Sequence, residues 1–249
     1  MDFEITLKLF DLINILLFIG FIIFSYYYWG SSISNKIAKP YKWENAILNN
    51  EISKDLVSFE KSYYDKVRLY NIWFQIQRLN KENIKGAYAE LGVYKGETAK
   101  IIHLSDPNRK LFLFDTFSGF DKNDLSIENN SDTKYNSKNF SDTNLDEVKT
   151  FINGNDNIEF IEGYFPESLK KHHDIKYAFI HLDADLYAPT LAALKYFYPR
   201  LENGGVIIIH DYNHDWNGNR KAVEEFMSTL NTPLIELTDW QGSALIIKS

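Results

Sequence analysis

Hydrophobic residues after position 85 gather in short runs, separated by longer segments in which apolar residues recur at helical spacing. The strand-like runs span residues 87–91, 111–115, 158–162, 177–183, 206–210, 234–237 and 244–248. Buried apolar runs joined through helices are typical of parallel strands. The pattern therefore predicts an α/β core, a seven-stranded, mostly parallel sheet of the Rossmann-like type with helices on both faces.

Two helices and the direction of the last strand follow from the same pattern. Pro189 occupies the first turn of one helix-like segment, and the pair Gly204 and Gly205 ends it. Residues 220–230 repeat the helical spacing. The loop 238–243 is too short to hold a crossover helix, so the last strand must run antiparallel to the one before it.

A glycine-containing turn, Glu90-Leu-Gly92-Val-Tyr-Lys-Gly96, follows the first strand. Glycines at this spacing let the backbone turn tightly and approach a ligand, and Glu90 can hold a positive or hydroxyl group. The second strand ends at Asp115, 19 residues after Gly96, where doubly wound folds carry an acid that binds a ribose. The alternative is the strand-to-helix turn of any α/β protein.

Charge narrows the choice of cofactor. The turn lacks the third glycine of a Gly-x-Gly-x-x-Gly phosphate loop, and Glu90 would repel a diphosphate. S-adenosylmethionine carries a sulfonium cation and no phosphate. The sequence therefore favours S-adenosylmethionine over a dinucleotide, with Asp115 as the ribose ligand.

Acidic and imidazole side chains follow the fourth and fifth strands. Asp183 and Asp185 come at the end of one, and His210 and Asp211 at the end of the next. The carboxyl ends of parallel strands meet at the ligand-binding edge, so these side chains are expected to lie together. Carboxylates suit Mg²⁺, whereas an imidazole shifts the preference toward Mn²⁺, Zn²⁺ or Fe²⁺. Such a metal lowers the pKa of a bound hydroxyl.

These residues differ in the roles that we expect. His210 and Asp211 point to opposite faces if the strand continues through both, so Asp183 and Asp211 are the preferred metal ligands. His210 is either a further ligand or a strand-end histidine. Asp185 either joins the ligands or caps the following helix. His214 is either the general base or a surface histidine.

Five segments together resemble the macrocin O-methyltransferase family: Glu90 to Gly96, Leu113-Phe-Asp-Thr-Phe-Ser-Gly119, Ile161-Glu-Gly-Tyr-Phe165, Leu182-Asp-Ala-Asp-Leu-Tyr187 and Gly204-Gly-Val-Ile-Ile-Ile-His-Asp-Tyr212. They occur in order within residues 60–249. The resemblance implies a class I methyltransferase that transfers a methyl group from S-adenosylmethionine to a sugar hydroxyl with a divalent metal, Mg²⁺ being the expected ion. A reversed final strand is typical of that fold.

The resemblance also assigns site residues. It implies that the cofactor is lined by Glu90, Gly92, Val93, Tyr94, Gly96, Thr98, Asp115, Thr116, Phe117, Gly163, Tyr164 and Asp183. Tyr164 and Phe117 would enclose the adenine, with core packing as the alternative for either ring. Asp183, His210 and Asp211 would hold the metal, although the family commonly has two acids where this chain has His210-Asp211. The catalytic candidates are Asp183, His210 and His214.

Two other functions fit parts of the sequence. Asp183-Ala-Asp185 also matches the Asp-x-Asp motif of metal-dependent glycosyltransferases, but those enzymes do not need the glycine turn two strands earlier. A cofactor-binding regulator without turnover would need no metal acids. The presence of Asp183 and Asp211 beside the glycine turn favours the methyltransferase.

The remaining sequence suggests three regions. Residues 1–40 form a hydrophobic N-terminal segment, residues 41–84 a helical extension, and residues 85–249 the methyltransferase domain. Between about 119 and 150 the chain is rich in Asp, Asn, Ser and Lys, which predicts a loop. It leaves the ligand-binding edge and is therefore expected to act as a lid, with a disordered surface insertion as the alternative.

Residues 12–29 carry no charge and end in aromatic residues, as expected of a membrane-spanning helix with an interfacial belt. A buried helix or a dimerisation helix is the alternative. Lys36, Lys39 and Lys42 follow the run, so the positive-inside rule predicts a single span in the inner or cytoplasmic membrane with the catalytic domain in the cytoplasm. A soluble cytoplasmic protein is the other interpretation. The acidic leader disfavours a cleaved signal peptide.

Composition limits the partners. The 249 residues carry a net charge of -7 without a basic run, which excludes nucleic acid as an expected partner. The chain has no cysteine, so disulfides and thiolate metal sites are excluded. The expected acceptor is a small-molecule or lipid-linked saccharide, and a homo-oligomer remains open.

Overall fold

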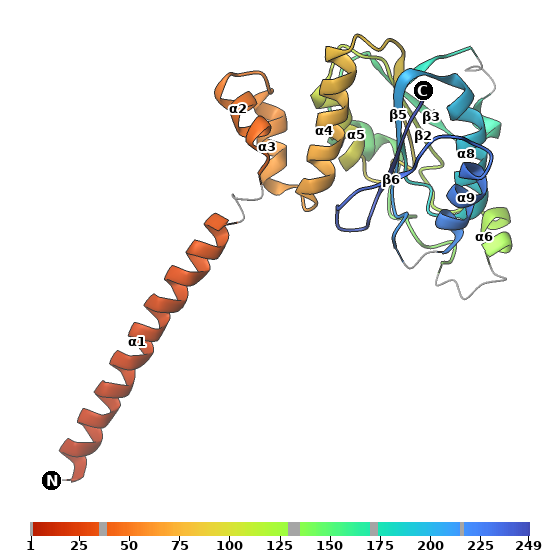
Figure 1. Ribbon diagram of the computed structural model, residues 1–249. Helices are drawn as coiled ribbons and strands as arrows, with labels where there is room; N and C mark the ends of the chain where they lie inside the picture. Colours follow the sequence, from red (N-terminus) through yellow and green to blue (C-terminus); the bar gives the residue numbers. More distant parts are fainter. Residues whose placement is uncertain (1, 35–38, 129–134, 170–173, 215–216) are drawn as a thin grey trace. The chain divides into compact units, whose positions relative to one another are not determined.

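The computed structural model describes residues 2–34, 39–128, 135–169, 174–214 and 217–249 (Figure 1). The chain divides into two units, one ending at Glu51 and the other running from Ile52 to Ser249. The first unit contains helices α1 (Asp2–Ser34) and α2 (Tyr41–Leu48). The second unit contains the sheet and all the elements that form the site.

The helices of the second unit are α3 (Lys54–Ser62), α4 (Lys66–Lys81), α5 (Glu97–Ser105), α6 (Lys122–Glu128), α7 (Leu145–Ile152), the short 3₁₀ helix η1 (Glu167–Leu169), α8 (Tyr187–Arg200) and α9 (Asn217–Met227). The strands are β1 (Ala87–Leu91), β2 (Leu111–Asp115), β3 (Ile158–Glu162), β4 (Tyr177–Leu182), β5 (Leu201–Ile209), β6 (Ile235–Glu236) and β7 (Ala244–Ile247).

The strands form one seven-stranded sheet in the order β3-β2-β1-β4-β5-β7-β6. Strands β1 to β5 are parallel, whereas β7 runs antiparallel to both β5 and β6. The predicted α/β fold with a reversed last strand is thus confirmed. The chain reverses its order of strand addition between β1 and β4, and open α/β sheets bind ligands beside such a switch point.

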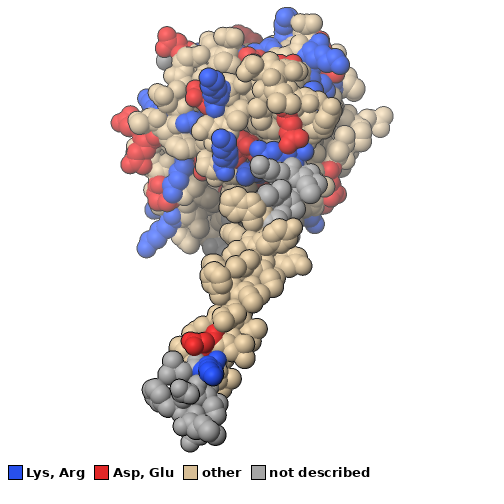
Figure 2. Space-filling model, turned by 90° about the vertical axis from the view of Figure 1, so that its left-hand side faces the viewer, with Lys and Arg blue, Asp and Glu red and all other residues tan. Residues whose placement is uncertain are grey.

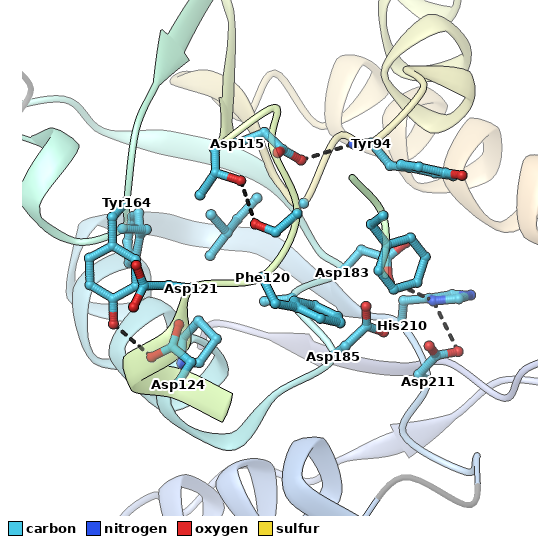
Figure 3. A pocket seen from close by; sticks show the side chains of 18 of the residues that line it. Tyr94, Asp115, Phe120, Asp121, Asp124, Tyr164, Asp183, Asp185, His210 and Asp211 are labelled. Carbon is cyan, nitrogen blue, oxygen red and sulfur yellow. Dashed lines mark hydrogen bonds and ion pairs between the residues drawn. The ribbon is translucent and has the colours of Figure 1, made fainter. Parts of the chain in front are cut away.

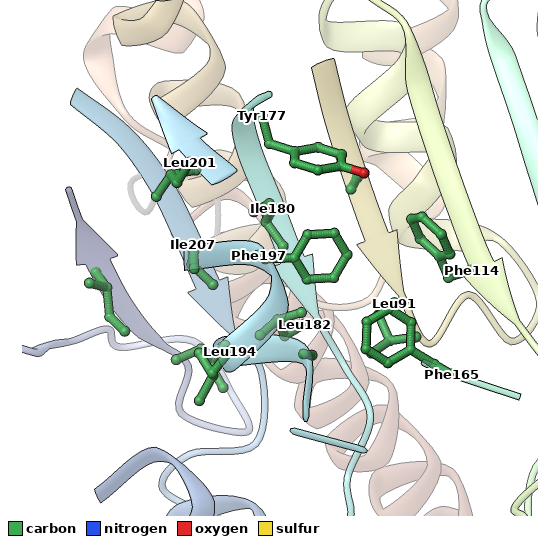
Figure 4. Packing of buried hydrophobic residues seen from close by; sticks show 14 of the residues in the cluster. Leu91, Phe114, Phe165, Tyr177, Ile180, Leu182, Leu194, Phe197, Leu201 and Ile207 are labelled. Carbon is green, nitrogen blue, oxygen red and sulfur yellow. The ribbon is translucent and has the colours of Figure 1, made fainter. Parts of the chain in front are cut away.

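Helices cover both faces of the sheet. Helix α4 packs on α5 and on β4 and β5, whereas α8 packs on α9 and on the same two strands (Figure 1). All six residues of β4 are buried, which explains why its sequence is a continuous apolar run. On the α8 side, Phe197 contacts the rings of Phe114, Phe165 and Tyr177, with centroids 5.1 to 5.8 Å away (Figure 4).

The helical extension is divided between the two units. Helices α3 and α4 both contact α5, so residues from Ile52 onward belong to the unit that contains the sheet. The predicted boundary near residue 84 therefore does not separate two structural units. The apolar stripe of α4, which includes Ile72 and Ile76, is fully buried.

The region expected to be a loop, residues 119–150, contains α6 and most of α7. Asn144 caps α7 by accepting a hydrogen bond from the Glu147 amide, and Val148 and Ile152 are buried four residues apart. Two apolar residues at that spacing are enough for a short helix that packs on α5. Residues 129–134 of the predicted lid lie outside the described residues.

The two predicted helices near the C-terminus are present with shifted ends. Helix α8 begins at Tyr187, which puts Pro189 in the first turn as predicted. Helix α9 begins at Asn217, three residues before the expected start, and ends at Met227. The Asn219 side chain donates a hydrogen bond to the backbone carbonyl of His210, which links the start of α9 to the end of β5.

Helix α1 is long and apolar on all sides. Its 33 residues extend for about 50 Å. Residues Lys8–Trp29 form a helix long and apolar enough to cross a membrane, and none of its apolar side chains is buried. Figure 2 shows this helix as mostly tan, with the charged side chains that are visible on it near one end.

Candidate active site

A cavity of about 270 Å³ lies at the carboxyl ends of the central strands. Its wall comes from the segments that follow β1, β2, β3, β4 and β5, together with α4 and the β6–β7 turn (Figure 3). The predicted site residues that line it are Gly92, Tyr94, Asp115, Thr116, Gly163, Tyr164, Asp183, Asp185, His210 and Asp211. The cavity thus occupies the ligand-binding edge that the strand pattern predicts.

Close packing between the β1 and β4 loops requires glycine at position 92. Its φ is 86°, in the left-handed region, and a Cβ there would lie 1.9 Å from the carbonyl oxygen of Asp183. Gly92 therefore brings the glycine turn directly against the carboxylate-bearing loop.

Asp115 fixes the shape of the turn. One oxygen accepts hydrogen bonds from the backbone amides of Val93 and Tyr94 at 2.6 and 2.9 Å, and the other accepts one from Phe117 at 2.7 Å. A carboxylate offers about four acceptor positions, so about one remains for a ligand hydroxyl. Asp115 lines the cavity where a ribose ligand was predicted.

Glu90 does not line the cavity. Its carboxylate contacts the ring of His181 at 2.9 Å, and the two side chains are 1% and 0% exposed. Burial raises the pKa of Glu90, and burial lowers the pKa of His181 to about 3. Glu90 was expected to contact the cofactor. Its carboxylate is instead buried against His181 and does not reach the cavity wall.

Three other side chains, those of Asp183, His210 and Asp211, lie in contact at the cavity wall. The His210 Nδ1 atom lies 2.9 Å from Asp183 Oδ1 and 3.1 Å from Asp211 Oδ1 (Figure 3). Burial disfavours the charged imidazole, but the two carboxylates outweigh it and raise the pKa of His210 to about 9. Burial opposes ionisation of Asp183, yet the charge of His210 keeps its pKa below the usual range.

The side chains of His210 and Asp211 do not point to opposite faces, because the strand does not continue through both residues. Strand β5 ends at Ile209, so the alternation of a strand no longer applies to the next two residues. Asp211 has a φ of 57°, which turns its side chain back toward His210. Both residues therefore line the cavity.

Asp185 does not cap α8. The N-cap residue is Leu186, which makes no side-chain cap hydrogen bond, and the Tyr187 amide instead donates to the carboxylate of Glu128 on α6. Asp185 faces the cavity, and burial together with the charges of Asp183 and Asp211 raises its pKa.

The segment after β2 supplies an aromatic and acidic wall that the motifs did not identify. Phe120 contacts the rings of Tyr135 and Phe140, with centroids 5.0 and 5.2 Å away. Phe140 in turn contacts Tyr94 of the glycine turn. Tyr164 donates a hydrogen bond to Asp124 at 2.7 Å, which links the β3 loop to α6. The unpredicted residues on the cavity wall include Arg68, Phe120, Asp121, Asp124, Phe140 and Gln241.

Several predicted residues lie off the cavity wall: Glu90, Val93, Gly96, Thr98, Phe117 and His214. Val93 and Phe117 support it through their backbone amides, which hold Asp115. Phe117 is 5% exposed, so its ring is packed in the protein, the alternative considered for it. The backbone amide of His214 donates to the Asp211 carbonyl.

The donors on the wall fit a divalent cation and a sulfonium cofactor. One potential ligand atom from each of Asp183, His210 and Asp211 lies within 4.8 Å of the others. The Nε2 atom of His210 is buried without a hydrogen-bond partner among the described residues. Once His210 loses its second ring proton, these oxygen and nitrogen donors are at a separation that suits a divalent metal, and the acidic wall suits a positively charged ligand.

Two curated relatives with a similar sequence are named as O-methyltransferases, and the name of the first includes a rhamnosyl group. The chain is 24% identical over 215 residues to 8-demethyl-8-(2,3-dimethoxy-alpha-L-rhamnosyl)-tetracenomycin-C 4'-O-methyltransferase of Streptomyces olivaceus, covering 80% of this chain and 82% of that one. It is 27% identical over 191 residues to mycinamicin III 3''-O-methyltransferase of Micromonospora griseorubida, covering 70% and 74%.

Solved structures share the fold. The O-methyltransferase NovP superposes with a TM-score of 0.62 at 20% identity, covering 74% of this chain and 80% of that one. The calicheamicin methyltransferase CalS11 superposes with a TM-score of 0.55 at 20% identity, covering 85% and 87%. The family model described as Macrocin-O-methyltransferase (TylF) matches residues 32–245. The chain therefore belongs to the macrocin O-methyltransferase family and is an S-adenosylmethionine-dependent O-methyltransferase.

Proposed function

We propose that this enzyme methylates a hydroxyl of a sugar or glycoconjugate, and that Asp183, His210 and Asp211 hold a divalent metal that orients this acceptor. The observation that carries the proposal is the cluster of these three side chains on the wall of the cavity that the glycine turn also lines. The acceptor class is supported by the O-methyltransferase activities named for the two curated relatives, one of which acts on a rhamnosyl compound.

Charge favours this proposal over a metal-dependent glycosyltransferase. Six aspartates line the cavity: Asp115, Asp121, Asp124, Asp183, Asp185 and Asp211. A nucleoside diphosphate would face repulsion from most of them, whereas a sulfonium compound would be attracted. Family membership also assigns the chain to the methyltransferases.

The nucleoside end and the reacting end of the cavity can be separated. Asp115, Gly163 and Tyr164 follow β2 and β3, so we place the ribose and adenine there. Asp183 and His210 follow β4 and β5, and we place the acceptor hydroxyl beside them. The aromatic wall of Phe120 and Phe140 would exclude water between the two ends.

The proposed reaction needs one proton transfer and one displacement. Asp183 accepts the hydroxyl proton on a carboxylate oxygen, and the acceptor oxygen attacks the methyl carbon as its bond to sulfur breaks. The products are the methyl ether and S-adenosylhomocysteine. Because His210 lowers the pKa of Asp183, this carboxylate alone is a weak base. A divalent cation would lower the pKa of the acceptor hydroxyl and so make the transfer possible.

Calorimetry on the purified full chain in detergent tests the proposal. We expect micromolar binding of S-adenosylmethionine, and Mg²⁺ or Mn²⁺ binding that the Asp211→Asn variant weakens by about 10-fold or more. A nucleoside diphosphate sugar serves as the control ligand. Metal-dependent binding of that control without binding of S-adenosylmethionine would contradict the assignment.

We also propose that α1 anchors the enzyme in the inner or cytoplasmic membrane, with the catalytic unit in the cytoplasm. Lys8–Trp29 is long enough for the hydrocarbon core, and its exposed apolar side chains would be costly in water. Lys39 and Lys42 follow the helix on the proposed cytoplasmic side. An anchored enzyme would meet lipid-linked saccharides directly.

Membrane fractionation tests the anchor. After an alkaline carbonate wash, the full chain should remain in the pellet, whereas a variant with Leu16, Ile19 and Ile23 replaced by Asp should move to the soluble fraction. Protease added to sealed spheroplasts should leave the catalytic unit intact. Release of the unaltered chain by the wash would overturn the proposal.

A further inference from the structure

We propose that Arg68 on α4 binds the carboxylate of the methionyl part of S-adenosylmethionine. This inference rests on S-adenosylmethionine as the cofactor and adds a residue outside all the motifs. Arg68 precedes the sheet in the chain and yet lines the cavity with residues that follow β1, β4 and β5.

The charge of the cofactor requires such a residue. At neutral pH S-adenosylmethionine carries a sulfonium and an ammonium group, which suit the acidic wall, and also a carboxylate, which does not. Among the described residues that line the cavity, Arg68 is the one permanent cation. The ring of His210 also lines the cavity, but its Nδ1 atom already contacts two carboxylates. Only Arg68 can therefore offset the repulsion on the methionyl carboxylate.

The guanidinium is held in place before any ligand arrives. It forms ion pairs with Asp65 at 3.6 Å and Asp239 at 3.9 Å, and its Nη2 atom donates to the Gln241 side chain at 2.9 Å. The side chain is 11% exposed. A guanidinium fixed this way loses little freedom on binding a carboxylate, and its fork of donors suits that group.

The arrangement also leaves donor capacity. The Nε atom is buried beside Asp239, whereas the Nη1 atom is not fully buried and makes no hydrogen bond to a described residue. The Nη2 atom donates to Gln241 in the turn between β6 and β7, which puts the guanidinium toward the end of the sheet opposite β3. This is the side away from Tyr164 and Asp124, where the nucleoside is proposed to bind. The methionyl end of the cofactor would then extend toward Arg68.

A purely structural role is the competing explanation, because Arg68 also ties α4 to the β6–β7 turn through Asp239 and Gln241. The two roles differ in their dependence on the ligand. Loss of a structural tie would weaken every cofactor analogue alike. Loss of a carboxylate partner would weaken only ligands that carry the carboxylate.

The test compares two ligands by calorimetry on the full chain: S-adenosylmethionine and its decarboxylated form, which keeps the adenosine, sulfonium and amine. Arg68→Met should reduce the affinity for S-adenosylmethionine by about 10- to 100-fold, the range for a hydrogen bond to a charged group. Affinity for the decarboxylated form should change by less than about threefold. Arg68→Lys should restore part of the loss, because it keeps the charge.

Arg78→Met is the matched control, since Arg78 lies on the same helix and pairs with Glu82 away from the cavity. Equal losses for both ligands in Arg68→Met and Arg68→Lys would overturn the proposal in favour of a structural role. Unchanged affinity for S-adenosylmethionine in Arg68→Met would overturn it as well. If the unaltered enzyme bound neither ligand, the cofactor assignment itself would fail, a result distinct from either outcome.

Discussion

Two carboxylate–histidine pairs of equal length lie side by side in this enzyme and hold their protons differently. Glu90–His181 and Asp183–His210 each have an oxygen 2.9 Å from an imidazole Nδ1, and the two rings are 6.1 Å apart. The pKa of Glu90 is raised and that of His181 lowered, which favours a neutral pair. The directions are opposite for Asp183 and His210, which favours an ion pair.

Surroundings explain the contrast, since the contact distance is the same. Neither member of the Glu90–His181 pair is more than 1% exposed, so the loss of hydration disfavours both charges. His210 contacts a second carboxylate, Asp211, and the side chain of Asp183 is 23% exposed. The two carboxylates beside His210 raise the pKa of its ring, whereas burial and then the charge of Asp183 raise the pKa of Glu90.

The two pairs therefore have different roles, one in stability and the other in ligand binding. A neutral, buried pair satisfies its own hydrogen bond and fixes the spacing of β1 and β4 beneath the cavity. An ionised pair at the wall offers charge to a ligand. We therefore expect substitutions in the two pairs to fail in different measurements, ligand chemistry for Asp183 and stability for Glu90.

The largest effect should come from Asp183→Asn. The amide keeps the size of the side chain but loses the negative charge that pairs with His210 and the oxygen that would accept the acceptor proton. We expect methyl transfer to fall by about 100-fold or more while affinity for S-adenosylmethionine stays within about tenfold. Transfer is measured as incorporation of the labelled methyl group into a membrane lipid extract from the producing cells.

Thermal unfolding provides the control for this variant, because Asp183→Asn should keep the melting temperature within a few degrees. The matched substitution Asp185→Asn removes a neighbouring carboxylate whose pKa is raised, so its effect on transfer should be smaller. Full activity of Asp183→Asn would remove this residue from the chemistry and leave no difference in function between the two pairs.

Much of this architecture could be predicted from the sequence. The seven apolar runs correspond to the seven strands, since a buried parallel strand leaves a continuous hydrophobic signature. Asp115, Asp183 and Asp211 were expected at the site because the ends of parallel strands converge there. These predictions need only the order of elements and the rule that places ligands at one edge.

Other parts depend on contacts that sequence spacing does not encode. Arg68 reaches the cavity through the packing of α4 on the sheet, although more than a hundred residues separate it from Asp183. The motif predicts that Glu90 binds a ligand. The register of β1 with β4 shows that Glu90 lies beside His181. His210 and Asp211 share a site because β5 ends one residue earlier than expected.

A smaller effect, on stability, is expected from Glu90→Ala. Removing the carboxylate leaves the buried Nδ1 atom of His181 without its partner and opens a small cavity. We expect the free energy of unfolding to fall by roughly 1–3 kcal/mol, the usual cost of an unsatisfied buried polar group. Urea unfolding of the full chain in detergent, followed by tryptophan fluorescence, measures the change. A variant as stable as the unaltered enzyme would contradict the supporting role of this pair.

The smallest and most discriminating effect should come from Glu90→Gln. If Glu90 is protonated in the folded enzyme, an amide reproduces its neutral state, and the stability at pH 5 should change by less than about 1 kcal/mol. Because the folded-state pKa of Glu90 is raised, its contribution is full below the unfolded pKa near 4.5 and declines as pH rises toward the folded value. Glutamine has no such titration.

The Glu90→Gln variant should therefore gain stability relative to the unaltered enzyme as pH increases from about 4.5 to 7. Urea unfolding at several pH values measures this difference, and Glu224→Gln on the exposed face of α9 corrects for the general loss of one negative charge. An ionised Glu90–His181 pair would give no such gain, because a carboxylate with a lowered folded-state pKa changes its contribution to stability below about pH 4.5. That outcome would mean that both pairs are ionised, so the difference in their surroundings would not change their protonation states.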